Sequence, residues 1–195
     1  MLNLITSYGH RVNHSGKKMK NIKTAFILVS ILWGIHLFNI IFPYELRLLG
    51  IRPRDIQGLW GILFCPFLHQ NFSHLIANSS ALIVLLSVSF MYSRKLTGIA
   101  LIYIIIIGGG MVWLLGEPKS LHIGASGIVF GLIGFLIFSG FYHKNLKAIL
   151  IAIIVCFMYG GALWSLFIVM PGVSWSGHFF GFLSGIVASR SVLKN

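Results

Sequence analysis

Histidine, asparagine and serine side chains stand near the start of three separate apolar segments of the chain. His74 and Asn78 are four residues apart and therefore share one face of a helix. Ser126 lies in a Gly-Ala-Ser-Gly sequence, and His178 stands near the start of another apolar segment. A serine hydroxyl becomes a nucleophile when a neutral histidine within hydrogen-bond reach removes its proton. These residue types predict nucleophilic acyl transfer, with a serine as nucleophile and a histidine as base.

The tetrahedral intermediate of acyl transfer needs hydrogen-bond donors for its oxyanion. Ser126 is expected at a helix N-terminus, where free backbone N–H groups and the helix dipole favour a negative oxygen. Gly124 and Gly127 let a carbonyl approach this backbone closely. The side chains of His74 and Asn78 are further candidate donors.

Each of these residues also has a structural explanation. Small residues such as serine line helix contacts in membranes, and a single histidine there is more often hydrogen-bonded structure than a catalyst. His36, in the middle of an apolar segment, is interpreted as structural. Three histidines in or near polar segments are interpreted as solvated: His10, His14 and His143.

A metal site is the other use of clustered histidines. Four are candidates: His69, His74, His122 and His178. No carboxylate accompanies them and no H-E-x-x-H helix exists, whereas catalytic zinc sites usually combine three ligands with supporting carboxylates. We expect neither a metal nor another cofactor.

Composition indicates a membrane protein. Of 195 residues, 57% are hydrophobic and 9% charged, and the mean hydropathy is +0.91, which leaves too few polar groups to cover a water-facing globule. The net charge of +12 would suggest a nucleic-acid partner in a polar protein. Here it is interpreted as a topology signal, with no nucleic acid expected. Cys65 is interpreted as a surface-proximal thiol and Cys156 as a packing residue, not as a disulfide framework.

Six apolar segments are long enough for helical membrane crossings, each of which needs roughly 20 residues. They predict an all-α, polytopic bundle of six transmembrane helices: Lys23–Phe42, Phe72–Tyr92, Leu96–Leu115, Ser126–Tyr142, Leu146–Ile168 and Trp175–Leu193. Residues 1–22 are polar and basic and are expected to form an unstructured cytoplasmic tail, with Met19 as an alternative start. Residues 23–193 are expected to form one domain.

The charges orient these segments. With a cytoplasmic N-terminus, the inner segments contain eleven basic residues and no acid, and the outer loops contain four basic residues and all three acids. This is the positive-inside pattern, and it predicts that both termini are cytoplasmic. The second, fourth and sixth segments then begin near the outer leaflet, which brings the candidate residues to one depth.

The interiors of the segments lack Asp, Glu, Lys and Arg, the usual residues of ion pathways, so a pump or transporter is disfavoured. Glycines at three- and four-residue spacing predict close packing of the fourth and sixth segments. The fourth segment has 17 residues, or roughly 25 Å. It is shorter than the hydrocarbon core, so Ser126 is expected below the outer surface, reached by water through a cavity.

Three motifs together resemble those of the rhomboid intramembrane serine proteases. They are His69-x4-His74-x3-Asn78, the Gly-Ala-Ser-Gly sequence at Ser126, and His178-x2-Gly181-x3-Gly185. The resemblance covers about residues 23–193.

The resemblance implies a catalytic dyad of Ser126 and His178 without an aspartate. It also implies that His74 and Asn78 help form the oxyanion hole with the Ser126 backbone N–H. Gly124 is predicted to help stabilise the oxyanion or the substrate. Three residues are implied to support the site: His69, Phe130 and Gly181. Residues 43–71 correspond to the family's first external loop, partly immersed in the outer leaflet.

Two positions depart from the family pattern. Phe130 stands where many members have a tyrosine that packs on the catalytic histidine. Trp60 is followed by Gly61, where a Trp-Arg pair is common. These differences concern loop details and leave the dyad intact.

The resemblance implies substrates that are membrane proteins with a transmembrane helix that unwinds easily near the outer face. A helix hides its carbonyls in hydrogen bonds, so only a frayed segment exposes a scissile bond. The expected location is a bacterial cytoplasmic membrane. The rival hypotheses are a non-proteolytic rhomboid-like protein that binds unstable membrane helices and, more distantly, a channel.

Overall fold

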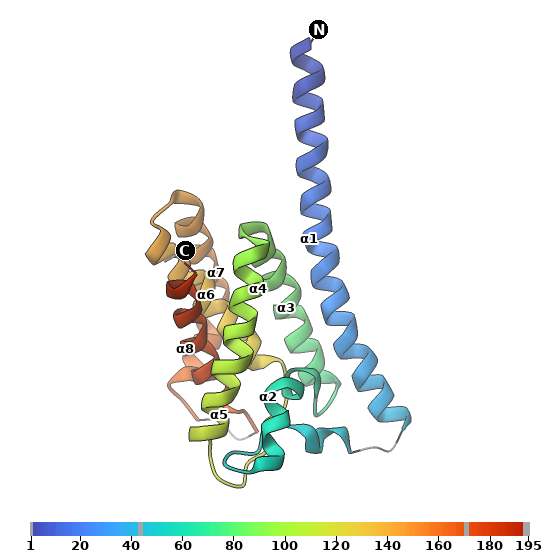
Figure 1. The fold of residues 1–195 in the computed structure, drawn as a ribbon, viewed down its shortest axis with the longest axis vertical. Coiled ribbons are helices and arrows are strands. Elements are labelled where there is room, and N and C mark those ends of the chain that lie inside the picture. The colour runs from blue at the N-terminus through green and yellow to red at the C-terminus, as the bar shows by residue number, and fades with distance from the viewer. Residues whose placement is uncertain (1, 43–44, 170–171, 193–195) are drawn as a thin grey trace.

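A computed structural model of the chain describes residues 2–42, 45–169 and 172–192, with side chains described from residue 16 onward. Within these ranges the chain is helical apart from loops and one isolated antiparallel bridge between Ile51 and His122. The helices run roughly side by side, as Figure 1 shows. The predicted all-α, polytopic membrane bundle is confirmed.

Five stretches of the described chain are long and apolar enough to cross a membrane. The helices that form them are α1 (Leu2–Ile41), α3 (Phe72–Tyr92), α4 (Arg94–Tyr103) continuing through the π-turn η4 (Ile104–Gly108) into α5 (Gly109–Leu115), α6 (Ser126–His143), and α7 (Leu146–Leu163) with the 3-10 turn η5 (Trp164–Leu166). The sixth helix, α8 (Trp175–Ser191), has 17 residues and packs mainly against α6.

Polar side chains mark where several helices begin. Asn71, Ser93, Asn145 and Ser174 each accept a hydrogen bond from a backbone N–H in the first turn of α3, α4, α7 and α8. Such caps replace partners that the first turn of a helix lacks. The predicted limits Phe72 and Tyr92, and the predicted start at Ser126, are observed.

The prediction of an unstructured tail over residues 1–22 is wrong, since α1 already begins at Leu2. Lysine is a good helix former, and extending an existing helix requires no new nucleus. The basic segment with Lys17, Lys18 and Lys20 therefore continues the helix of the first membrane crossing.

Helix α6 lies at the centre of the bundle and contacts α3, α7 and α8. Phe135, Leu132, Ile133 and Leu136 are at most 1% exposed. This helix therefore has no lipid-facing stripe in its middle turns.

Glycines let α6 and α8 approach backbone to backbone. A Cβ atom at Gly185 would overlap the carbonyl of Gly131, and one at Gly181 would overlap the carbonyl of Gly127. The predicted close packing of the fourth and sixth apolar segments is confirmed.

Helix α7 is packed much more loosely. Only Ala148 and Val155 are buried among its residues, and Phe157 is 90% exposed. Cys156 is also exposed, so its interpretation as a packing residue is wrong. An apolar side chain can face lipid without the penalty it would meet in water, so hydropathy alone does not separate packed from lipid-facing positions.

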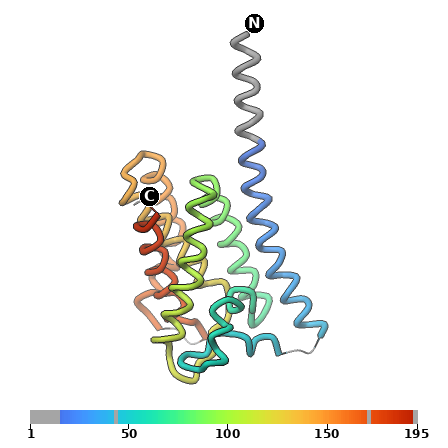
Figure 2. Tube along the Cα trace, in the orientation of Figure 1, coloured from blue at the N-terminus to red at the C-terminus, as the bar shows by residue number. Residues whose placement is uncertain are grey.

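The segment between α1 and α3 consists of short turns: η1 (Leu46–Leu49), η2 (Ile56–Trp60), α2 (Gly61–Phe64) and η3 (Cys65–Phe67). Arg54 donates to the carbonyls of Leu114 and Gly116 at 3.0 Å each. The Trp113 indole donates to the Asp55 carbonyl at 2.8 Å. This first loop is thereby fastened to the end of α5, near the loop that leads into α6 (Figure 2).

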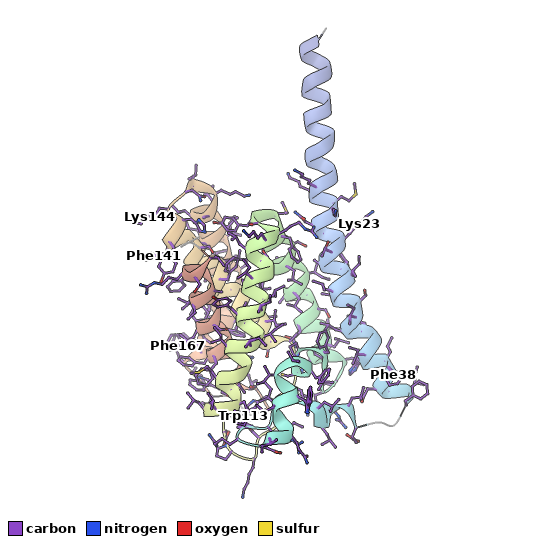
Figure 3. The ribbon with its side chains drawn as sticks, viewed as in Figure 1. Lys23, Phe38, Trp113, Phe141, Lys144 and Phe167 are labelled. Atoms are coloured by element: carbon purple, nitrogen blue, oxygen red, sulfur yellow. The ribbon has the colours of Figure 1, made fainter. Side chains whose placement is uncertain are left out.

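The beginning of α1 and the end of α8 lie at the same end of the bundle (Figure 1). Figure 3 places Lys23 and Lys144 towards that end and Trp113 at the opposite one. This arrangement agrees with the expectation that both termini share one side. The assignment of this end to the cytoplasmic side of the membrane is a prediction from charge.

Candidate active site

The chain turns sharply just before α6, at Gly124. Its φ of +116° is a conformation that favours glycine. A Cβ atom at Gly124 would lie 2.6 Å from His74 Cε1 and 3.6 Å from Asn78 Nδ2. The side chains of His74 and Asn78 therefore lie beside the backbone that leads into Ser126.

Asn78 is buried, and its Nδ2 has no hydrogen-bond partner among the described residues. A buried donor without a partner costs free energy, so this amide is available to an oxygen that arrives near Gly124. His74 is held nearby, because Asn71 caps α3 by accepting from the His74 backbone N–H at 2.8 Å.

His69, in the loop before α3, packs edge-on against the ring of His74 with 5.2 Å between centroids. It is 3% exposed. Burial lowers the pKa of His69 to about 4, and repulsion from His74 adds to the lowering. His69 is therefore neutral at neutral pH, as a packing partner of His74 should be.

Ser126 is half-buried and is the first residue of α6. The carbonyl of Ala125 accepts hydrogen bonds from the N–H groups of Ile128 and Val129. The N–H groups of the first helical turn have no partner within the helix. A negative oxygen near Ser126 would meet the N–H groups at the very start of α6 and the positive end of the helix dipole.

His178 lies in the first turn of α8, and its ring stacks on Phe130 with centroids 4.0 Å apart and planes 15° apart. Phe130 is one helical turn after Ser126. The two helices touch in the same place, because Gly127 lies against Gly181 and near the carbonyl of Gly177. Ser126 and His178 are therefore brought to the same level of the α6–α8 contact.

Two serines outside the predicted site contact its histidines or its helices. Ser165 Oγ lies 3.2 Å from His178 Nδ1 and donates to the carbonyl of Ala162 at 2.7 Å. Ser174 Oγ accepts from the N–H of Gly177 at 3.1 Å. The position of Ser174, three residues before Gly177, is a recognisable helix-cap pattern. No pattern in the sequence indicates Ser165.

His122 connects the loop before α6 to the start of α8. Its Nε2 lies 2.7 Å from Ser120 Oγ, and its Nδ1 lies 2.7 Å from Ser174 Oγ. Burial lowers the pKa of His122, and Glu117 opposes this shift. Its backbone pairs with Ile51 of the first loop, so one residue joins three segments around the site.

A cavity of about 40 Å³ lies beside Ser126. One water needs about 10–15 Å³ of such space, so the cavity is large enough for a few water molecules. Its lining includes residues from the first loop, η4, α5, α6 and the start of α8: Cys65, Ile104, Val112, Ser126, Ser174 and Gly177.

Cys65 is more enclosed than the sequence suggested. Its Sγ lies 3.7 Å from the carbonyl of Gly124, and burial raises the pKa of the thiol to about 12. The residue as a whole keeps intermediate exposure, so the interpretation as a surface-proximal thiol holds only in part. Cys65 remains a neutral thiol that packs beneath the turn at Gly124.

The remaining histidines lie away from this site. His36 is buried and packs edge-on against Phe72, in agreement with a structural role. His143 packs edge-on against Tyr92, and its buried Nε2 has no hydrogen-bond partner among the described residues. His143 is of intermediate exposure, so the interpretation of His143 as solvated fails for Nε2 only. The side chains of His10 and His14 lie outside those described.

The described residues do not gather into a metal site. No three His, Cys, Asp or Glu side chains in residues 16–42, 45–169 and 172–192 lie close enough together to hold an ion. The geometry thus gives no support to the alternative of a four-histidine metal centre.

Comparison with known proteins identifies the family. A sequence profile described as Rhomboid domain matches residues 57–195, which is more than half of the chain. This chain belongs to the rhomboid family. The rhomboid profile includes Ser126, His178, His74 and Asn78.

Relatives of this rhomboid protein occur in bacteria and plants. An uncharacterized protein of Mycobacterium tuberculosis is 38% identical over 176 residues, which cover 85% of this chain and 72% of the relative. RHOMBOID-like protein 5 of Arabidopsis thaliana is 33% identical over 156 residues, covering 72% of this chain and 47% of the relative. No solved structure gives a significant match.

Proposed function

We propose that this rhomboid protein is a serine endopeptidase that cleaves transmembrane segments of other membrane proteins, using Ser126 and His178. The contacts of residues 124–127 support this function most strongly. On one side, Gly124 touches His74 and lies near Asn78, and on the other, Gly127 touches Gly181 of the helix that carries His178. This turn thus joins the proposed nucleophile to the proposed oxyanion donors and to the helix that carries the proposed base.

In the proposed reaction, Ser126 Oγ attacks the scissile carbonyl carbon while His178 Nε2 takes the hydroxyl proton. The carbonyl oxygen becomes an oxyanion that accepts hydrogen bonds from Asn78, His74 and the N–H groups at the start of α6. His178 then gives its proton to the leaving amine, the C–N bond breaks, and an acyl-enzyme remains.

Water completes the proposed reaction. It attacks the acyl carbon, loses a proton to His178, and the Ser126 oxygen leaves and regains that proton. The cavity beside Ser126 is a route for this water. No metal or other cofactor takes part in these steps.

The proposed substrates are membrane proteins with a transmembrane helix that unwinds easily, and the lipid bilayer is the working environment. We place the enzyme in a bacterial cytoplasmic membrane with both termini cytoplasmic and cleavage near the outer face. The charge pattern of the sequence supports this orientation.

The test is cleavage of a single-span substrate with a fluorescent label and a glycine-rich segment near its outer end, in liposomes containing the purified protein. Wild type is expected to cleave it, and Ser126→Ala and His178→Ala are each expected to lose about 10³-fold or more in kcat. Labelling of Ser126 by a fluorophosphonate reports nucleophile activation without a substrate.

Equal cleavage by all three proteins would exclude the dyad. Equal retention of the substrate helix without cleavage or labelling would instead favour a non-proteolytic binding protein. Ser189→Ala is a matched control, because Ser189 is a buried serine of α8 that donates to its own helix.

A further inference from the structure

We propose that Ser165 is a positioning residue for the base, since its oxygen accepts the Nδ1 proton of His178 and thereby leaves Nε2 free to take the proton of Ser126. This inference rests on the proposed protease function. Ser165 lies in η5, outside the three motifs that carry the rhomboid resemblance.

The direction of each hydrogen bond follows from the groups involved. Ser165 has one hydroxyl hydrogen, and its Oγ lies 2.7 Å from the carbonyl of Ala162, which can only accept. The hydroxyl hydrogen is therefore donated to Ala162. The contact of 3.2 Å between Ser165 Oγ and His178 Nδ1 is then a hydrogen bond in which Nδ1–H donates.

This direction fixes the tautomer of His178. A neutral imidazole carries one N–H, so a proton on Nδ1 leaves a lone pair on Nε2. That lone pair is what a general base uses to accept the proton of Ser126. When Nε2 becomes protonated, Nδ1–H still donates to Ser165, so the same contact is kept in both protonation states.

No carboxylate orients His178. The three acids of the chain, Glu45, Asp55 and Glu117, all lie in described loops, and His178 forms no ion pair or hydrogen bond with any of them. In serine proteases with a triad, an aspartate on the other ring nitrogen holds the tautomer and the orientation of the histidine. Ser165 occupies that position here with a neutral oxygen.

Stacking alone does not select the tautomer. Phe130 lies flat against His178 and fixes the plane of the ring, but turning the ring over within that plane would exchange its nitrogen and carbon positions. The hydrogen bond to Ser165 distinguishes these two orientations. Phe130 therefore fixes the plane of the His178 ring, and Ser165 fixes which way round the ring lies in that plane.

Ser165 is itself held in place. It is 9% exposed, and the adjacent Leu166 accepts a hydrogen bond from the Trp175 indole at 2.8 Å. Trp175 is the first residue of α8, three residues before His178. The turn η5 is thus fastened to the same helix end that carries the base.

The test compares Ser165→Ala, Ser165→Thr and the control Ser189→Ala in the liposome assay. Ser165→Ala is expected to lower kcat about 10-fold, the value of one hydrogen bond, with KM unchanged because Ser165 does not touch the substrate. Ser165→Thr keeps an acceptor oxygen and is expected to recover most of kcat. Ser189→Ala is expected to match wild type.

A second readout is independent of cleavage. In protein labelled with ¹⁵N-histidine, the His178 signals are expected to show the Nδ1–H tautomer in wild type and a mixture with Nε2–H in Ser165→Ala. Wild-type kcat in Ser165→Ala, or identical His178 signals in the two proteins, would overturn the role of Ser165. If wild type does not cleave the substrate but the tautomer change is still observed, only the proposed protease function is overturned.

Discussion

Helices α7 and α8 both pack against α6, but they do so in opposite ways. Helix α8 meets α6 through glycines at which a Cβ atom would overlap backbone carbonyls. Helix α7 buries only Ala148 and Val155 and leaves most of its apolar side chains exposed. Ser126, the candidate nucleophile, lies on α6, and His178, the candidate base, lies on α8, so both belong to the tightly packed pair of helices.

This difference indicates that the relative position of α6 and α8 must stay fixed, whereas the position of α7 can vary. Small misplacement of reacting groups costs much of the rate of an enzyme, and close backbone packing restricts such displacement. A loosely packed helix can shift at low cost, because few contacts are lost. Four predictions test this comparison.

The largest expected effect is on core packing. Phe135→Ala, at a fully buried position of α6, is expected to lower the free energy of unfolding by about 3–5 kcal/mol. Phe157→Ala removes a phenylalanine ring from the exposed face of α7 and is expected to change the free energy of unfolding little. Unfolding in mixed micelles measures both, and equal losses would contradict the contrast between the helices.

The glycine contact should respond to a single methyl group. Gly185→Ala places a Cβ atom against the carbonyl of Gly131 and is expected to destabilise the protein by about 1–3 kcal/mol. Gly160→Ala in α7 has nothing within 4 Å and is expected to stabilise the helix by up to about 1 kcal/mol. The same unfolding assay measures both changes. If Gly185→Ala left the free energy of unfolding unchanged, α8 would be able to move away from α6 freely.

Ring stacking across the α6–α8 pair is the next target. Phe130→Leu keeps an apolar side chain but removes the aromatic face on His178, a contact worth about 0.5–1.5 kcal/mol. We expect kcat in the liposome assay to fall roughly 3- to 10-fold. Phe130→Tyr keeps the ring and is expected to stay near wild type. Unchanged kcat in Phe130→Leu would mean that stacking does not orient the base.

Acid should weaken the loop side of the site, where the buried His69 packs against His74. His69 has an ordinary pKa of 6.5 when unfolded and about 4 when folded, so the unfolded state takes up the proton first as the pH falls. Stability present above pH 6.5 is therefore lost progressively towards pH 4.

Melting temperatures at pH 7.5 and pH 5 measure this loss. His69→Asn is expected to reduce the dependence on pH, and the remainder is expected to come from the other histidines whose pKa burial lowers, His122 among them. If His69→Asn kept the full dependence, His69 would not be its source.

The sequence was sufficient for the helices and for the residues that meet at Gly124. Long apolar segments and the glycine spacing of α6 and α8 are local patterns, so they could be read without a structure. The roles of Ser165 and His122 could not, because each depends on contacts between segments far apart in the chain. The exposure of Cys156 was predicted wrongly for the same reason.

The two cysteines differ so much that the native protein already contains a site for selective labelling. Cys65 is half-buried and its thiol is neutral, whereas Cys156 is exposed on α7. A membrane-soluble thiol reagent carrying a spin label or fluorophore should therefore attach to α7 alone. The motion of the most loosely held helix can be followed by spectroscopy without changing any residue of the site.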